Sequence, residues 1–148
     1  MTVETWDAFH ESVQKDIQQL ADGGFLAIDY GQEIEGGASP YAQVARMGSR
    51  FWCEISSNTF LPGDSWPLHG DLLRWAGWSP PNTDFPNWSS EWSSANAATT
   101  AVIHGLRYGR GCTNPSFLEW HTATLPQQMG FMCRFRAIFR RIHRPSVP

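Results

Sequence analysis

Two side chains of the acid–base type lie close together near the middle of the chain. His69 and Asp71 are two residues apart in DSWPLHGDLLRWAGW. An imidazole beside a carboxylate can transfer protons or bind a metal ion when further groups complete the site. A single pair of this kind arises by chance in most chains, and His104, His121 and His143 stand alone. We therefore expect no catalytic residues and no enzyme activity.

The spacings that hold metals, phosphates or nucleophiles do not occur either. Cys53, Cys112 and Cys133 are far apart, with no C-x-x-C or Cys/His ligand spacing. The segment YGRGC carries its glycines after a predicted helix rather than before one, and G-x-S-x-G, H-E-x-x-H and P-loop motifs are missing. We expect reduced cysteines, no bound metal and no cofactor.

Tryptophan is the residue type that stands out. The chain has eight tryptophans, and four of them lie in LLRWAGWSPPNTDFPNWSSEW. Pro80, Pro81 and Pro86 remove backbone donors there and exclude a regular element. Three roles are open for these indoles: they line a ligand site, they form an exposed patch for a partner, or they pack in the core around the connection.

Apolar periodicity predicts the elements that position these residues in the first half of the chain. Residues 3–21 are predicted as a helix, because apolar residues recur at spacings of three and four and Thr2 or Thr5 can cap its start. Three stretches with alternating residues follow. They are predicted as strands with antiparallel pairing: 25–30, 41–47 and 50–61.

Two further helices are predicted in the second half. One starts at Asp64 or Ser65, with Pro67 in its first turn, and ends at Gly77. Its apolar residues are expected to face the core: Leu68, Leu72, Leu73 and Trp75. The other runs from Ser93 to Gly109 or Gly111, with a buried stripe of Ala98, Ala101, Val102 and Leu106. NPSFLEW is predicted as a short helical turn.

Composition indicates a globular chain with an uneven distribution of charge. Of its 148 residues, 41% are hydrophobic and 17% are charged, which predicts one folded domain rather than disorder. Residues 1–119 have a net charge of −8, whereas the remainder has five arginines and no acid. Neither a signal peptide nor an apolar run long enough for a membrane helix is indicated, so we expect a cytoplasmic protein.

The C-terminal segment 127–148 is predicted as a basic amphipathic helix that follows a single domain, 1–126. Its apolar side chains recur at helical spacing, and its arginines surround them: Phe131, Phe135, Ile138 and Ile142, with Arg134, Arg136, Arg140, Arg141 and Arg144. Such a helix can bind anionic lipid, nucleic acid or an acidic protein surface. We expect it to dock on its own acidic body or on a second copy of the chain.

Five short motifs carry a resemblance to a known family. They are Tyr41-Ala42-Gln43-Val44-Ala45, Glu54-Ile55-Ser56-Ser57-Asn58, Leu72-Leu73, Gly77-Trp78-Ser79-Pro80-Pro81 and Asn87-Trp88. The pattern resembles the TY-Chap domains of actinobacterial proteins, which are related to YbjN and to type III secretion chaperones such as the Tir chaperone. It extends roughly from Thr5 to Trp120, and the last 28 residues depart from it.

The resemblance implies an α+β fold in which an antiparallel twisted sheet is flanked by helices, as in type III secretion chaperones. It also implies structural roles for the residues of the tryptophan segment: Gly77, Trp78, Pro80, Pro81, Asn87 and Trp88. Trp66 and Trp92 lie outside the motif and are the better candidates for exposed contact residues.

Two function classes remain open. The first is a non-enzymatic, chaperone-like module that binds a protein client as a homodimer, with secretion-associated and toxin-neutralising roles as special cases. The second is a binder of nucleic acid or another anionic surface through the arginine-rich segment, in which nucleic acid is the less favoured partner. The residues expected to contact a partner are Trp66, Trp92, Phe131, Phe135, Arg134, Arg136, Arg140 and Arg141.

Overall fold

The computed structural model describes residues 4–31, 39–59, 61 and 66–124 of the chain. Its elements follow in the order α1 (Trp6–Gln18), β1 (Gly24–Tyr30), β2 (Tyr41–Met47), β3 (Arg50–Ile55), α2 (Gly70–Trp75), β4 (Trp88–Trp92), α3 (Ala95–His104), a π-helical turn η1 (Gly105–Gly109), a 3-10 turn η2 (Pro115–Phe117) and β5 (Leu118–Thr124). The chain is an α+β fold, as predicted.

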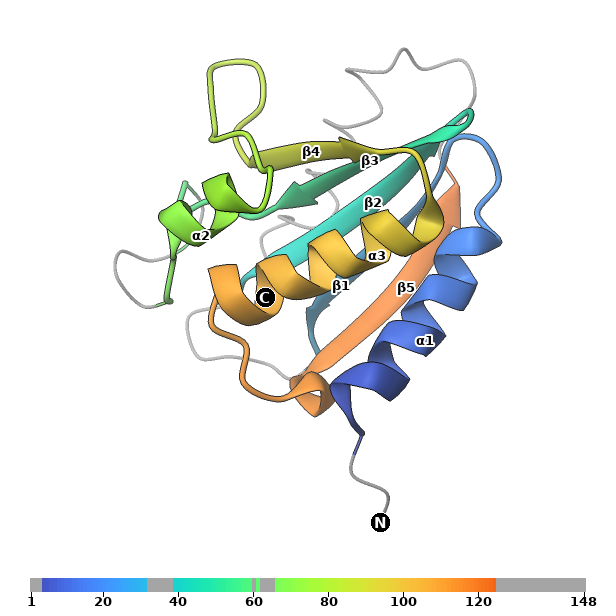
Figure 1. Cartoon of the computed structure of the whole chain (residues 1–148), viewed down its shortest axis with the longest axis horizontal. Helices are drawn as coiled ribbons and strands as arrows, with labels where there is room; N and C mark the ends of the chain where they lie inside the picture. The colour runs from blue at the N-terminus through green and yellow to red at the C-terminus, as the bar shows by residue number, and fades with distance from the viewer. Residues whose placement is uncertain (1–3, 32–38, 60, 62–65, 125–148) are drawn as a thin grey trace, which may run out of the picture.

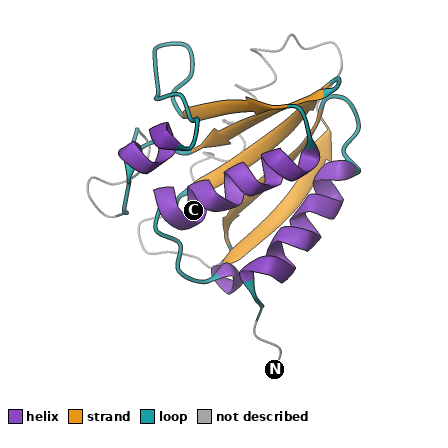
Figure 2. Ribbon diagram, in the orientation of Figure 1, coloured by secondary structure: helices purple, strands orange, loops and turns teal. Residues whose placement is uncertain are grey.

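The strands form one antiparallel sheet in the order β4-β3-β2-β1-β5. The last strand therefore lies beside the first, with Trp120 paired to Ile28. Figure 1 shows α1 and α3 lying across one face of the sheet, and Figure 2 shows the same arrangement as a layer of helices on a layer of strands. Within the described part of the chain, the long helices therefore pack on one face of the sheet, and no described helix packs on the other.

Strand alternation divides the side chains between these two faces. Residues at one set of positions pack with α1 and α3 in the main core: Leu26, Ile28, Ala42, Val44, Phe51, Cys53, Ile55, Trp88 and Leu118. Residues at the alternate positions point to the opposite face, where Phe25 is paired with Ala45 and Ala45 with Trp52. We call this second surface the helix-free face.

The two long helices confirm the periodicity argument. In α1, Phe9, Val13 and Ile17 are fully buried, and Thr5 caps the helix by accepting a hydrogen bond on Oγ1 from the Ala8 N–H at 3.1 Å. Helix α3 is capped in the same way by Ser94, which accepts from the Ala97 N–H at 3.1 Å. The predicted apolar stripe of this region is buried: Ala98, Ala101 and Val102 in α3, and Leu106 in the turn that follows it.

The π-helical turn after α3 lies very close to its neighbours, and glycine makes this possible. A Cβ atom on Gly105 would lie 2.8 Å from two side-chain carbons of Ile55, and one on Gly109 would lie 2.6 Å from Leu73. These distances are shorter than any normal carbon contact. The missing side chains therefore let η1 pack directly on β3 and α2.

The predicted second helix is wrong in its length and its orientation. Helix α2 begins at Gly70, and His69 at its start makes no side-chain capping bond. The predicted start at residue 64 or 65 lies outside the described residues. Leu73 is buried as expected, but Leu72 is 51% exposed and Trp75 is 90% exposed. A helix of six residues can bury one narrow stripe, and here that stripe contains Leu73.

Two strands are absent from the sequence-based prediction. Strand β4, of sequence WSSEW, pairs with β3, and strand β5 follows directly after the 3-10 turn in the segment predicted as a helical turn. Both are edge strands of the sheet. Edge strands with a polar outer face show weak alternation, which explains why the pattern did not indicate them.

Candidate functional site

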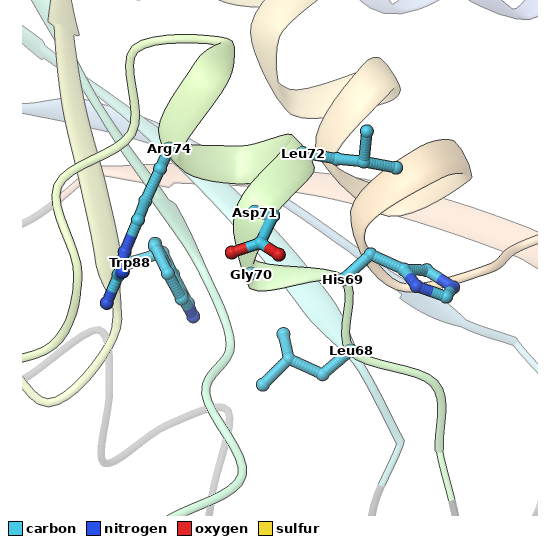
Figure 3. A pocket seen from close by; sticks show the side chains of 7 residues that line it. All are labelled: Leu68, His69, Gly70, Asp71, Leu72, Arg74 and Trp88. Atoms are coloured by element: carbon cyan, nitrogen blue, oxygen red, sulfur yellow. The ribbon is translucent and has the colours of Figure 1, made fainter.

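A pocket of about 480 Å³ lies beside α2 (Figure 3). Its wall combines three apolar side chains with three polar or charged ones. The lining residues are Leu68, His69, Gly70, Asp71, Leu72, Arg74 and Trp88. Trp88 reaches it from β4, and the other side chains come from α2 and the residues just before it.

Helix α2, which supplies most of the pocket lining, also carries exposed apolar side chains. Among the described residues, the two most exposed large hydrophobic side chains are Trp75 at 90% and Leu72 at 51%, and both belong to α2. They are three residues apart, so they lie on neighbouring sides of the helix. Exposed apolar side chains on one short helix are typical of a surface that binds a partner.

The polar residues of the pocket do not form a catalytic arrangement. Figure 3 shows the His69 ring turned away from the Asp71 carboxylate, and no described hydrogen bond joins the two. The Arg74 guanidinium instead lies over the Trp88 ring, 6.0 Å from its centroid. His69 and Asp71 are therefore not a hydrogen-bonded pair in this structure.

Within the described part of the chain, His, Cys, Asp and Glu side chains form no group of three that could hold a metal ion. Cys53 and Cys112 are buried free thiols, and Cys133 lies outside the described residues. Among the described helices, none is long and apolar enough to cross a membrane.

A second group of polar residues is buried on the helix-free face. Gln43 Nε2 donates a hydrogen bond to Glu54 Oε2 at 2.8 Å, and Asn87 Nδ2 donates to the Tyr41 hydroxyl at 2.8 Å. Asn87 Nδ2 also lies 3.5 Å from Glu54 Oε1, and Asn87 Oδ1 accepts from the backbone N–H of Ser57 at 3.2 Å. We call these residues the carboxyl network: Tyr41, Gln43, Glu54 and Asn87.

Burial dominates the chemistry of the carboxyl network. Glu54 is 3% exposed, and loss of solvation raises the pKa of its carboxyl to about 7, although hydrogen bonds from Gln43, Asn87 and Trp52 act in the opposite direction. Burial also raises the pKa of the Tyr41 phenol. A carboxyl group in this position titrates near neutral pH, which makes the network a structural element sensitive to protonation.

The sequence-based prediction included Asn87 and missed the other three members of the network. Tyr41, Gln43 and Glu54 appear in the family pattern without an assigned role. The missed signal was a polar residue at a strand position flanked by buried apolar residues, as in YAQVA and WCEI. A buried polar side chain needs hydrogen-bond partners, so such positions indicate a network.

The residues predicted as a structural motif in the tryptophan segment differ in burial. Trp78 and Trp88 are 3% and 5% exposed and belong to the main core. Gly77 has φ +100°, a left-handed conformation that side chains disfavour, and it closes α2. Pro80 and Pro81 lie at the surface of the following loop. A structural role for the motif remains a prediction that this packing supports.

Of the predicted partner-binding residues, the structure describes Trp66 and Trp92. Trp66 is partly buried against Tyr30, with ring centroids 5.1 Å apart, and Trp92 is partly buried with its indole N–H donating to Ser90 Oγ at 2.8 Å. Neither lines the pocket beside α2. The remaining residues lie outside the described part of the chain: Phe131, Phe135, Arg134, Arg136, Arg140 and Arg141. The segment 127–148 and its boundary with the domain therefore stay predictions.

The comparisons with known proteins agree with the resemblance found in the short motifs. A family model named TY-Chap3, described as T3SS (YopN, CesT) and YbjN peptide-binding chaperone 3, matches residues 1–124. Comparisons with curated proteins and with solved structures give no match. The family match spans every described element from α1 to β5 and includes the carboxyl network and the tryptophan segment. The chain therefore belongs to the TY-Chap3 family of T3SS and YbjN peptide-binding chaperones.

Proposed function

We propose that this protein is a non-enzymatic chaperone that binds an unfolded protein client at the pocket beside α2. Membership of the family implies a peptide-binding role, and the pocket supplies a place for it. An apolar side chain of the client enters between Leu68, Leu72 and Trp88, while Trp75 packs on the neighbouring client residues.

The observation that carries this proposal is the exposure of Trp75. An indole that is 90% exposed contributes little to folding, and it leaves a large apolar surface in water. Tryptophan is also the residue type that contributes most often to binding energy at protein interfaces. Asp71 and Arg74 at the pocket rim have opposite charges, so they allow client segments with polar residues of either sign beside the apolar anchor.

The test uses a set of short fluorescent peptides, each with one central Trp, Leu or Phe between polar residues. Binding is measured by fluorescence anisotropy, and suppression of aggregation of a chemically unfolded model protein is measured in parallel. Trp75→Ala and Leu72→Ala are expected to weaken peptide binding by about tenfold or more, as at interface hot spots. Thermal melting of both variants should match the unaltered protein, because both side chains are exposed.

Phe117→Ala is the matched control. Phe117 is 45% exposed and stacks on Tyr30 rather than lining the pocket, so its removal should leave peptide binding unchanged. If Phe117→Ala weakens binding while Trp75→Ala and Leu72→Ala do not, the client binds elsewhere and the pocket assignment fails.

The finer roles depend on which client is bound in the cell. A secretion-associated chaperone would release its client for export, whereas a toxin-neutralising one would keep it inactive. Capture of cytosolic proteins on the unaltered protein, with Trp75→Ala as the negative control, distinguishes these roles by the identity of the specific client. Light scattering of the full chain tests whether the functional form is the homodimer.

A further inference from the structure

The helix-free face presents apolar side chains that none of the described helices covers. Phe25, Ala27 and Ala45 on this face are 2%, 1% and 4% exposed, yet none of them belongs to the core cluster that packs with the helices. At one corner Phe85 packs on Trp52, with ring centroids 5.0 Å apart. Side chains buried to this degree have a second layer over them, and none of the described helices supplies that layer.

The same face is acidic. Its acidic side chains come from four different strands: Asp29, Glu54, Glu91 and Glu119. Glu54 is buried within the carboxyl network, and Arg50 forms an ion pair with Glu91 at 2.6 Å, which leaves Asp29 and Glu119 without a described arginine or lysine partner. His121 is paired with Ala27 on the same face and lies close enough to affect the pKa of Asp29. A covering layer should therefore be amphipathic and basic.

The chain itself continues with a segment of this composition. Strand β5 ends at Thr124 on the edge next to β1, and 24 residues follow, with five arginines and no acid. Residues 125–128 can span at most about 14 Å, enough to bring the chain from the sheet edge onto its face. A helix over 129–144 would be about 24 Å long. Five strands span about 19 Å from the first axis to the last.

We propose that residues 129–144 form an amphipathic helix that docks on the helix-free face of the same chain. The apolar residues of this helix pack on the central strands around Phe25 and Ala45: Phe131, Phe135, Ile138 and Ile142. Its arginines lie at the rim, where Asp29 and Glu119 provide opposite charges. The helix-free face is then an internal interface, and the arginines are occupied by the body of the protein rather than by nucleic acid.

Thiol protection in the full chain tests this proposal. In a Cys133→Ser background, Ala45→Cys places a reactive group on the helix-free face, and Ala101→Cys is the matched control in a buried position on α3. The reaction rate of each introduced thiol with a small thiol reagent is measured in two proteins, one with the native C-terminal segment and one that also carries Phe135→Asp and Ile138→Asp. The thiol introduced by Ala45→Cys is expected to react at least tenfold faster in that variant, while the thiol introduced by Ala101→Cys keeps its rate.

A disulfide experiment with the native charges provides the second measurement. Ala45→Cys combined with Ile138→Cys, again with Cys133→Ser, should form a disulfide within one chain, whereas Ala101→Cys with Ile138→Cys should not. If the control thiol on α3 also reacts faster in the aspartate variant, the domain has loosened and the disulfide result decides alone. The proposal is overturned if the thiol at position 45 reacts at equal rates in both proteins. It is also overturned if disulfides form only between two chains, and that result identifies a second copy of the chain as the cover.

Discussion

Gln43 Nε2 donates a hydrogen bond to Glu54 Oε2 at 2.8 Å from the neighbouring strand, and both side chains are buried, at 0% and 3% exposure. The carboxyl group has no described cation beside it, so its environment favours the neutral acid. Because the folded protein and the unfolded chain bind this proton with different affinities, the stability of the protein depends on pH.

The stability of the protein should fall as the pH rises through this titration. The pKa of Glu54 is about 7 in the folded protein, against an ordinary value of 4.5. Between these values the unfolded chain loses the proton while the folded protein keeps it, so the free energy of unfolding decreases with pH by about 3 kcal/mol in all. Urea denaturation of the unaltered protein between about pH 4 and about pH 8 measures this slope.

Glu54→Gln is the control for that slope, because an amide keeps the shape and cannot ionise. At acidic pH, the free energy of unfolding of the variant should be equal to or lower than that of the unaltered protein. Above neutral pH, the variant should be the more stable of the two. Asp29, whose pKa is also raised by burial, contributes equally to both proteins and cancels in the difference. Parallel curves for the two proteins would show that the pKa of Glu54 is the same in the folded and the unfolded protein, contrary to this prediction.

Trp78→Ala should destabilise the protein, whereas Trp75→Ala should not. The two indoles are three residues apart, but Trp78 is 3% exposed and Trp75 is 90% exposed. Removal of a buried large side chain costs about 3–5 kcal/mol because it leaves a cavity. Thermal and urea denaturation of both variants measure the difference. Normal melting of Trp78→Ala together with lost peptide binding would instead assign Trp78 to the binding site.

Gly105→Ala should lower stability although alanine normally favours a helix. The added Cβ would lie 2.8 Å from Ile55 Cδ1 and Cγ1, and Ile55 is fully buried and cannot move away freely. Overpacking of this kind costs about 1–3 kcal/mol. Combining Gly105→Ala with Ile55→Val, which removes the Cδ1 atom, should recover part of the loss in urea denaturation. If stability does not recover in the double variant, contact between residue 105 and Ile55 is not the cause of the stability loss in Gly105→Ala.

Arg110→Met should leave the protein as stable as before or make it more stable. Arg110 is fully buried, and its Nη1 donates to Asn58 Oδ1 at 2.9 Å, while its Nε and Nη2 atoms have no partner among the described residues. Burial lowers the pKa of this guanidinium to about 10. Replacing a poorly paired buried charge with an apolar chain is often neutral or stabilising. A loss of about 2 kcal/mol or more in urea denaturation would show that the charge has a stabilising partner.

Local sequence patterns were sufficient for α1 and for the three central strands. The spacing of Phe9, Val13 and Ile17 predicted α1, which has one face against the core, and alternation predicted the strands although β1 and β2 are buried on both faces. The start of α2 was placed too early because Pro67 and the preceding polar residues favour a helix start. Here the helix begins at Gly70, next to the Trp88 ring.

The sites themselves required tertiary pairing that no local pattern contains. Gln43, Glu54 and Asn87 meet because β2 pairs with β3 and the loop before β4 returns to the same face. The exposure of Trp75 follows from which side of α2 contacts the core, and a six-residue helix has too few positions to show that side. The periodicity of short elements constrains orientation only weakly.

The isolated bridge between Ser79 and Ser89 gives the two edges of the sheet different properties. The backbone N–H of Ser79 donates to the Ser89 carbonyl at 2.8 Å, and the N–H of Ser89 donates to the Ser79 carbonyl at 3.1 Å. At this residue the outer backbone groups of β4 are therefore already paired. Among the described strands, β5 has no such partner on its outer side. This pairing opposes strand addition by another chain at the β4 edge. Two copies that met through β5 would form a closed two-fold pair, and the sheet could not extend into an open-ended fibre.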